Sequence, residues 1–279
     1  MRKAYDPYSY WNQLVSGKYD LATVGHPELG AYNRIAYRLR LSAFIKSIAN
    51  LPQWPCVRVF EAAFGVGFYL KFCADAGITQ LSGVDLSLAA VARAKNLFPE
   101  YHLFQCDITT ALSIQPGSAD LVTAIDVLYH IVDDQKWEQA LGQLCDLVSA
   151  GGVFVCTDKF PTTQIYQRDP HVRRRPVEMY ADVIRKHGLV IKKIQPVFVF
   201  MDDPIPDGRP HWLACLSYLQ WRVVNKAIRI FGPWQHVRNG VALFLAGVQF
   251  PFEKIALSLL NRSPNLEMMV AQRSNRKAE

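Results

Sequence analysis

A short stretch that follows a predicted strand has the residue types that let a backbone approach a ligand. Glu61 ends an apolar run, and small residues lead from it to Gly65 and Gly67. Glycine permits close backbone approach, and the helix that begins after these glycines offers free N–H groups. A dinucleotide-binding fingerprint would place a third glycine at the position of Leu70. The stretch therefore argues against a pyrophosphate cradle.

Three carboxylates follow the next predicted strands in turn. Asp85 lies 18 residues after Gly67, where a carboxylate can accept both hydroxyl groups of a ribose or simply cap a helix. Asp107 is placed to reach an adenine amino group or to stabilise its own turn. Asp126 opens the segment that ends at His130. Because open α/β sheets bind ligands at the carboxyl ends of their strands, we expect these groups to line one site.

The elements that position these residues alternate between strand and helix over residues 57–160. Ser87 is predicted to cap one helix, and Asp133 or Asp134 to open the helix that Gly151-Gly152 ends. Short apolar runs followed by amphipathic stretches predict parallel βαβ units with right-handed crossovers. The expected strands are 57–61, 81–85, 101–106, 119–126 and 153–157.

The rest of the chain is less regular. Pro176 suits the first turn of a helix that runs to His187. Arg173-Arg-Arg175 is predicted to be a solvated loop rather than an anion clamp. An extended segment is expected over 189–201, helices over 31–48, 211–231 and 240–261, and a last strand over 266–272.

Taken together, these motifs resemble those of the class I S-adenosylmethionine-dependent methyltransferases, over roughly residues 55–200. The family usually has glycine where this chain has Ala63, and the extra methyl group is expected to tighten the loop against the cofactor. The resemblance implies an α/β fold with a Rossmann-like, mostly parallel sheet whose last strand is antiparallel. The matching segments are 59–67, 83–87, 105–108, 120–130 and 147–153.

The resemblance also implies roles for these residues. The loop that begins at Glu61 would lie near the methionine part of the cofactor, Asp85 on the ribose, and Asp107 with Ile108 around the adenine. The segment that begins at Asp126 would face the sulfonium and the acceptor. No metal is expected. The residues predicted to bind S-adenosyl-L-methionine, or its product S-adenosyl-L-homocysteine, are Glu61, Ala62, Ala63, Gly65, Gly67, Asp85, Leu86, Asp107, Ile108, Asp126, Val127, Tyr10 and Arg38.

His130 is the predicted catalytic residue. An imidazole can take the proton of a hydroxyl group as a methyl group is transferred to its oxygen. The alternative is a structural histidine that bonds to the backbone. Tyr129, His130 and Lys159 are predicted to contact the acceptor, although Tyr129 can also serve only for packing. Asp133 and Asp134 are interpreted as helix caps rather than bases.

The first 50 residues are rich in aromatic side chains, among them Tyr10 and Trp11. Such rings attract cations, including a sulfonium, so this region can form a lid; the alternative is that its aromatics pack on the core. Arg34, Arg38 and Arg40 are candidates to pair with the cofactor carboxylate. The predicted division is a helical lid (1–51), a cofactor-binding core (52–202), a helical insertion or substrate cap (203–264), and the last strand with the tail (265–279).

Composition is that of a folded soluble protein: among 279 residues, 50% are hydrophobic and 20% charged. The longest run without a charged residue, 239–252, is too short to span a bilayer. The N-terminus has no apolar signal core, and the six scattered cysteines fit no zinc or redox spacing, so a cytosolic location is expected. Basic segments flank an acidic block at a net charge of +7, which can attract an acidic substrate or nucleic acid.

The sequence therefore predicts an S-adenosylmethionine-dependent methyltransferase. Methylation of exocyclic amines on nucleic-acid bases is disfavoured, because the segment that begins at Asp126 lacks the expected Asn/Asp-Pro-Pro-aromatic signature. By elimination, O-methylation of a small molecule such as a sugar or a natural-product intermediate is expected. N- or C-methylation of a small molecule and RNA methylation remain alternatives. A nicotinamide-dependent oxidoreductase and a catalytically silent cofactor-binding module are further alternatives, and the oligomeric state is left open.

Overall fold

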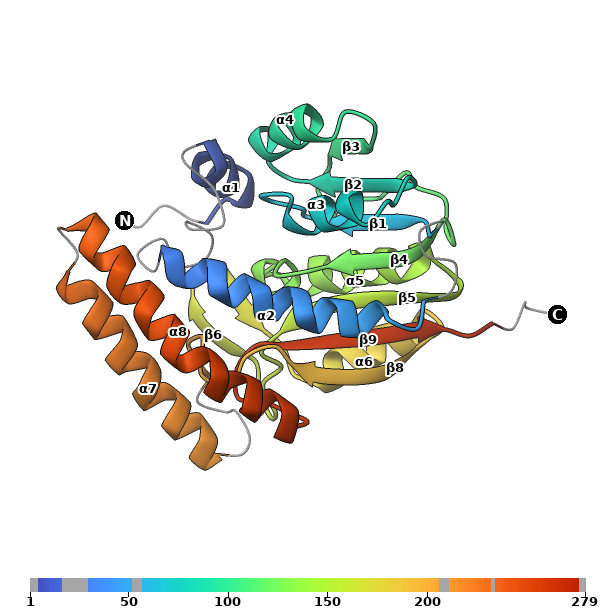
Figure 1. Cartoon of the computed structure of the whole chain (residues 1–279). Coiled ribbons are helices and arrows are strands. Elements are labelled where there is room, and N and C mark those ends of the chain that lie inside the picture. Colours follow the sequence, from blue (N-terminus) through green and yellow to red (C-terminus); the bar gives the residue numbers. More distant parts are fainter. Residues whose placement is uncertain (1–4, 17–29, 52–56, 206–210, 232–233, 276–279) are drawn as a thin grey trace.

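A seven-stranded sheet forms the centre of the computed structural model, which describes residues 5–16, 30–51, 57–205, 211–231 and 234–275 (Figure 1). The strand order is β3-β2-β1-β4-β5-β9-β8. Of these strands, β9 runs opposite to the other six, which all run in the same direction. This confirms the predicted mostly parallel sheet with an antiparallel last strand. The strands are β1 (Val59–Ala62), β2 (Leu81–Asp85), β3 (His102–Gln105), β4 (Ala119–Ala124), β5 (Val148–Asp158), β8 (Leu189–Pro196) and β9 (Glu267–Arg273), and a separate hairpin is formed by β6 (Tyr166–Asp169) and β7 (Val172–Arg174).

Helices cover both faces of the sheet, and each face has its own apolar core (Figure 1). α2, α3 and α4 pack on one face, and α5 and α6 on the other. β1 is buried along its whole length, as expected for a parallel strand covered on both sides. The helices are α1 (Pro7–Ser16), α2 (Ala31–Ile48), α3 (Phe68–Asp75), α4 (Leu88–Leu97), α5 (Asp134–Leu147), α6 (Val177–Lys186), α7 (His211–Ile230) and α8 (Gln235–Leu259), with a 3-10 turn at Leu128–His130.

The predicted helix caps are formed. The Ser87 hydroxyl accepts from the backbone N–H of Ala90, and Asp133, not Asp134, caps α5 by accepting from the N–H of Lys136. The predicted end of α5 is wrong: the helix stops at Leu147, and Gly151 lies inside β5 with a φ of 76°. β5 therefore begins earlier than the apolar run 153–157 suggested.

The predicted solvated loop at Arg173-Arg-Arg175 is also wrong. Arg174 is in the hairpin strand β7 and pairs with buried Asp158 at 2.5 Å. Arg175 is fully buried, and both it and Arg173 donate to the carboxylate of Asp134. These ion pairs hold the hairpin β6–β7 beside the start of α5, where it forms one wall of the site described below.

Helices α7 and α8 form an antiparallel pair that packs along α2 (Figure 1). Within the described residues, α8 alone is long and apolar enough to cross a membrane by length and composition, with a mean hydropathy of 1.4 and 17% of that stretch buried. The charge-free run 239–252 is only part of this helix. The helix continues on both sides of that run, through Arg238 and Lys254.

Candidate functional site

A cavity of about 890 Å³ opens at the carboxyl ends of β1, β2 and β4. The loops after these strands form its floor, α1 and α2 contribute one side, and the hairpin β6–β7 and residues 198–205 contribute the other. Most of the residues predicted to form the site line this single cavity, namely Glu61, Ala63, Gly65, Asp85, Leu86, Asp107, Ile108, Asp126, Val127, Tyr10, Tyr129, His130 and Lys159.

The loop after β1 is built from left-handed backbone. Ala63, Gly65 and Gly67 have φ values of 56°, 51° and 75°. Such a φ is unusual for alanine, so Ala63 carries a small strain that the glycine expected at this position would not. The Ala63 N–H donates to the carbonyl of Val84 at 2.7 Å, which fixes the loop to β2. The result is a tight backbone cradle below the cavity.

Asp85, at the end of β2, is held by two backbone donors. Its Oδ2 accepts from the N–H of Gly65 and its Oδ1 from that of Ser87, both at 2.8 Å. Burial raises the pKa of this carboxyl, and the two hydrogen bonds work in the opposite direction. Each oxygen keeps a further lone pair, so the carboxylate can still accept hydrogen bonds from a ligand.

Glu61 and Tyr69 present polar atoms with few protein partners to the same cavity. Burial, and then the charge of Asp85, raises the pKa of Glu61 well above its usual value. The buried hydroxyl of Tyr69 has no hydrogen-bond partner in the part of the chain that the structure describes. A buried polar group without a partner is costly, so these atoms mark a place where a polar ligand fits.

Asp107 has a local partner as well as a position on the cavity. Its Oδ1 accepts from the N–H of Thr109 at 2.8 Å, which is the turn role that the sequence left open. The adjacent Ile108 is buried and, with Leu86, gives the cavity an apolar rim at this end. This combination suits a flat aromatic ring with a polar edge.

Asp126 is paired with Arg40 of α2. Burial disfavours the charge on Arg40, but Asp126 more than compensates and raises the Arg40 pKa. Thr157 donates to Oδ1 of Asp126 at 3.0 Å, and Asp126 itself has a φ of 55°. The structure thus places Arg40, rather than the predicted Arg38, in the cavity, because Arg38 is exposed on another face of α2.

His130 sits in the 3-10 turn after β4. Its Nδ1 lies 2.9 Å from the carbonyl oxygen of His171. A carbonyl only accepts, so Nδ1 carries the proton and Nε2 holds the lone pair. Burial lowers the pKa of His130 to about 4, which keeps the ring neutral.

Aromatic side chains of α1 lie over His130. The ring centroid of Trp11 is 4.7 Å from that of His130, and Tyr10 stacks on His171 at 5.0 Å. α1 therefore contacts the hairpin β6–β7 across the mouth of the cavity. α2, by contrast, packs on β9 and α8 as part of the main body.

Lys159 is already engaged by the protein. It is buried, lies 3.2 Å from the carboxylate of Asp202, and donates to the carbonyl of Asp203. Burial lowers its pKa, and Asp202 opposes that shift. Arg174 lies 4.1 Å from the centre of the Tyr129 ring, so Lys159 and Tyr129, two of the three predicted acceptor contacts, already contact charged groups of the protein.

Besides Arg38, two further predicted residues do not line the cavity. Ala62 is buried in the sheet, and Gly67 precedes α3, where its backbone shapes the loop. Trp221, Phe198 and His171 also line the cavity and were not predicted from the sequence. They come from segments outside the parallel βαβ pattern, and no local motif marked them.

These residues fit S-adenosylmethionine. Asp85 has lone pairs for ribose hydroxyl groups, the polar atoms of Glu61 and Tyr69 would face the methionine part of the cofactor, and the Asp107–Ile108 rim suits adenine. Among the described residues, no group of three or more His, Cys, Asp or Glu side chains is arranged to hold a metal ion.

Comparison with known proteins supports the same assignment. Residues 59–152 match a sequence family described as a methyltransferase domain. This segment contains β1 to β4, α5 and the start of β5, and so all three carboxylates at the sheet edge. No curated protein matches the chain significantly.

Two solved structures share the fold. An S-adenosylmethionine-dependent methyltransferase from Mesorhizobium loti has a TM-score of 0.51 at 15% identity, with 83% of this chain and 98% of that chain covered. Phosphoethanolamine N-methyltransferase 2 from Haemonchus contortus, solved with S-adenosyl-L-methionine, has a TM-score of 0.56 at 14% identity, with 95% of this chain and 60% of that chain covered. Residues 59–152 therefore form a methyltransferase domain, and the chain shares the fold of S-adenosylmethionine-dependent methyltransferases.

Proposed function

We propose that this methyltransferase methylates a hydroxyl group of a small molecule, such as a sugar or a natural-product intermediate, with His130 as the general base. The orientation of His130 carries the proposal. Its Nδ1–H is held by the carbonyl of His171, so the basic Nε2 is available in the cavity that Asp85 also lines. A base oriented by a backbone acceptor is the arrangement that proton removal requires.

The chain supplies positioning and exclusion of water. When bound, S-adenosylmethionine provides a methyl group on a sulfonium. Asp85 fixes one end of the cofactor, and the Arg40–Asp126 pair holds the turn that carries His130. Trp11 and Tyr10 cover the cavity and limit access of water to the reacting atoms. Nε2 of His130 then accepts the proton that the acceptor hydroxyl loses.

The pKa of His130 makes this role testable. With a pKa of about 4, the ring is neutral at physiological pH and can accept a proton throughout that range. Activity should therefore stay level as the pH falls through 6.5 and decline only near pH 4 to 5. A histidine with an ordinary pKa would lose activity near 6.5.

The test compares His130→Gln with His187→Gln, a remote histidine paired with Asp146. Transfer of a labelled methyl group to a panel of hydroxyl acceptors gives kcat, and calorimetry gives the affinity for S-adenosylhomocysteine. We expect His130→Gln to lower kcat by roughly 10²–10⁴-fold with cofactor affinity nearly unchanged, and the control to change neither. An unchanged kcat in His130→Gln would show that His130 is not the general base.

N-methylation of an amine is the second candidate. The rings of Tyr10 and Trp11 suit a cationic acceptor, and one structural neighbour is a phosphoethanolamine N-methyltransferase. A neutral amine needs no base as its methyl group arrives. In that case His130→Gln would keep kcat within a few-fold, and the rate would rise with pH as the amine loses its proton.

The remaining alternatives have weaker support. RNA methylation rests only on the basic flanks, and steeply salt-dependent RNA binding would favour it. Tight cofactor binding without turnover on any acceptor would indicate a silent module. The five described cysteines are free thiols, which fits the proposed cytosolic location of the catalytic domain.

A further inference from the structure

The helix pair α7–α8 exposes an apolar stripe on each helix. The spacing of the exposed residues follows one helix face, at intervals of three, four and seven. On α7 these residues are 48–65% exposed: Trp212, Leu216, Leu219, Val223 and Ile230. On α8 they are 46–76% exposed: Val237, Phe244, Val248, Phe252, Ile255 and Leu259. Exposed apolar residues gathered on one helix face in this way mark an interaction site.

The opposite faces of the two helices hold them to the protein. Trp221 and Ile228 of α7 and Ala246 of α8 are buried in the core. Glu253 of α8 is fully buried and accepts hydrogen bonds from the backbone N–H groups of Val199 and Phe200. The apolar stripes therefore face away from the body, and their orientation is set by buried contacts.

The charges on this helix pair have one sign. Arg222, Lys226 and Arg229 lie on α7, and Arg238 and Lys254 on α8. Glu253 is the one acidic residue of the two helices, and it is buried. Exposed apolar residues on helices whose exposed charged residues are all basic are typical of helices that lie in the interface of an anionic membrane.

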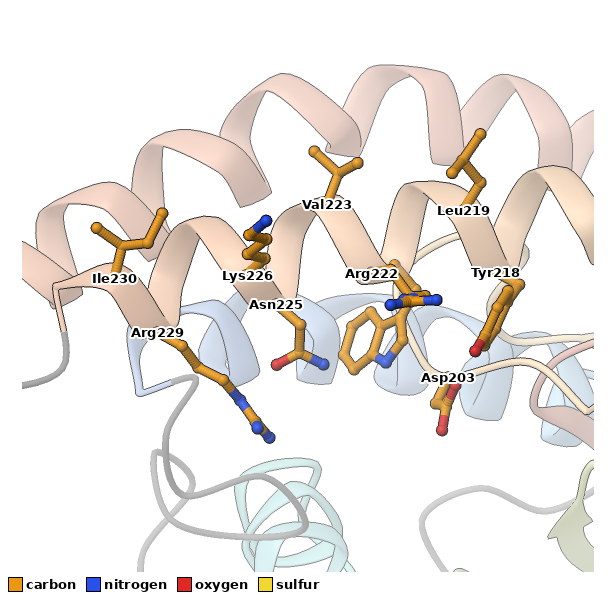
Figure 2. A pocket seen from close by; sticks show the side chains of 10 residues that line it. Asp203, Tyr218, Leu219, Arg222, Val223, Asn225, Lys226, Arg229 and Ile230 are labelled. Carbon is orange, nitrogen blue, oxygen red and sulfur yellow. The ribbon is translucent and has the colours of Figure 1, made fainter.

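A groove along α7 connects this surface with the active-site cavity. The groove has a volume of about 970 Å³, and Figure 2 shows Leu219 and Val223 on one side of α7 while Arg229 extends from the opposite side. Asp203 and Trp221 line both the groove and the active-site cavity. An acceptor that lies in the groove would therefore be next to the catalytic cavity.

We propose that α7–α8 docks the protein on the surface of an anionic lipid membrane, and that the methyl acceptor is an amphipathic molecule resident in that membrane. The inference about the acceptor rests on the proposed methyltransferase function, whereas the docking does not. The apolar stripes insert among the lipid chains, and the basic side chains contact the lipid phosphates. The groove beside Trp221 then receives the polar end of the acceptor.

The helices lie on the membrane rather than cross it. α8 is hydrogen-bonded to the body at two places: Glu253 accepts from the backbone N–H groups of residues 199–200, and Oε1 of Gln249 accepts from the hydroxyl of Tyr32. A helix with one face bonded to a folded domain cannot also be surrounded by lipid. Only its outer stripe is available to the bilayer.

Flotation with vesicles tests the docking without any need for activity. The full chain is mixed with vesicles of phosphatidylcholine alone, or of equal parts phosphatidylcholine and phosphatidylglycerol. We expect it to float with the mixed vesicles, to bind the neutral ones less, and to lose binding as salt is raised. Absence from both vesicle fractions would overturn the proposal.

A matched pair of variants locates the surface. Leu219 on α7 is 62% exposed, and Leu97 on α4 is 61% exposed. Leu219→Asp should reduce vesicle binding by about tenfold, whereas Leu97→Asp should leave it unchanged, with both variants keeping the wild-type affinity for S-adenosylhomocysteine. The opposite outcome is a wild type that does not bind vesicles and elutes as a dimer, with Leu219→Asp eluting as a monomer. That result would show that the surface binds a second copy of the chain and that the membrane proposal is wrong.

Labelled S-adenosylmethionine tests the acceptor. The protein is incubated with vesicles made from a total lipid extract, and the label is followed into the organic phase. We expect organic-phase label with the wild type and Leu97→Asp, and much less with Leu219→Asp. Vesicle binding with label entering only water-soluble acceptors would overturn the inference about the acceptor. Failure to bind S-adenosylhomocysteine would instead contradict the methyltransferase function itself.

Discussion

Asp85 is prepared for a ligand before the ligand arrives. Two backbone N–H groups fix its oxygens at 2.8 Å, so the predicted ribose hydroxyl would meet a carboxylate already in position. Asp85→Ala should weaken the binding of S-adenosylmethionine by roughly 1–3 kcal/mol, because charge-assisted hydrogen bonds are lost. Calorimetry measures this affinity, and Asp75→Ala, at an exposed carboxylate paired with Lys71, is the control. Equal affinities in the two variants would place the ribose elsewhere.

Arg40 shows the limit of residue-level prediction. The sequence has three arginines within two turns of α2, and any of them could have faced the site. Arg34 and Arg38 are four residues apart, so they share a helix face, and both are exposed. Arg40 reaches Asp126, whose own position depends on the turn after β4. The carboxylates could be predicted from the sequence because each follows a predicted strand. The position of Arg40 could not, because it depends on how α2 packs against the sheet.

At the scale of elements, α1 controls the environment of His130. Trp11→Ala should expose the His130 ring to water, and because burial is what lowers its pKa, that pKa should rise from about 4 towards 6.5. An NMR titration of the histidine ring signals measures this, with His130→Gln used to assign the resonance. Gln13→Ala, at an exposed position of the same helix, should leave the pKa unchanged. If the pKa of His130 stayed near 4 in Trp11→Ala, α1 would not be what shields the His130 ring from water.

Glu253 joins α8 to the 199–200 backbone with a carboxyl whose pKa burial raises to about 7. The folded protein thus binds a proton more tightly than the unfolded chain, so stability falls as the pH rises from about 4.5 to about 7. The loss contributed by this residue is at most about 3 kcal/mol. Glu253→Gln should remove that part of the pH dependence, as measured by urea unfolding at several pH values. If the free energy of unfolding of Glu253→Gln fell with pH as steeply as that of the wild type, Glu253 would not be the source of the pH dependence.

Elements marked by a local sequence pattern were predicted correctly. Elements held by contacts with residues distant in the sequence were not. The caps at Ser87 and Asp133 and the helix over 31–48 follow from short-range pattern. The hairpin β6–β7 has strands of four and three residues, and ion pairs to Asp134 and Asp158 hold it. Its position depends on α5 and β5, so no window of local sequence could reveal it.

In the whole molecule, the predicted cofactor residues and the rest of the cavity come from different parts of the chain. The carboxylates predicted to bind the cofactor all lie within residues 59–152, the segment that matches the methyltransferase domain. The cavity is also lined by α1, the hairpin β6–β7, residues 198–205 and Trp221, all outside that segment. The spacing of the motifs could therefore predict the cofactor, because it indicates which residues lie at the carboxyl edge of the sheet. It could not predict the acceptor, because tertiary packing alone brings those segments together.

Ligand binding should be visible in the stability of the whole chain, because the cavity is lined by segments spread from Tyr5 to Trp221. A ligand that binds only the folded state at one hundred times its Kd adds about 2.7 kcal/mol, which corresponds to a rise in Tm of roughly 5–10 °C. S-adenosylhomocysteine should produce this shift in the wild type and a smaller one in Asp85→Ala. Reduced nicotinamide dinucleotide should produce none, because Leu70 occupies the position where its pyrophosphate would need glycine. Stabilisation by the nicotinamide alone would reverse the assignment and favour an oxidoreductase.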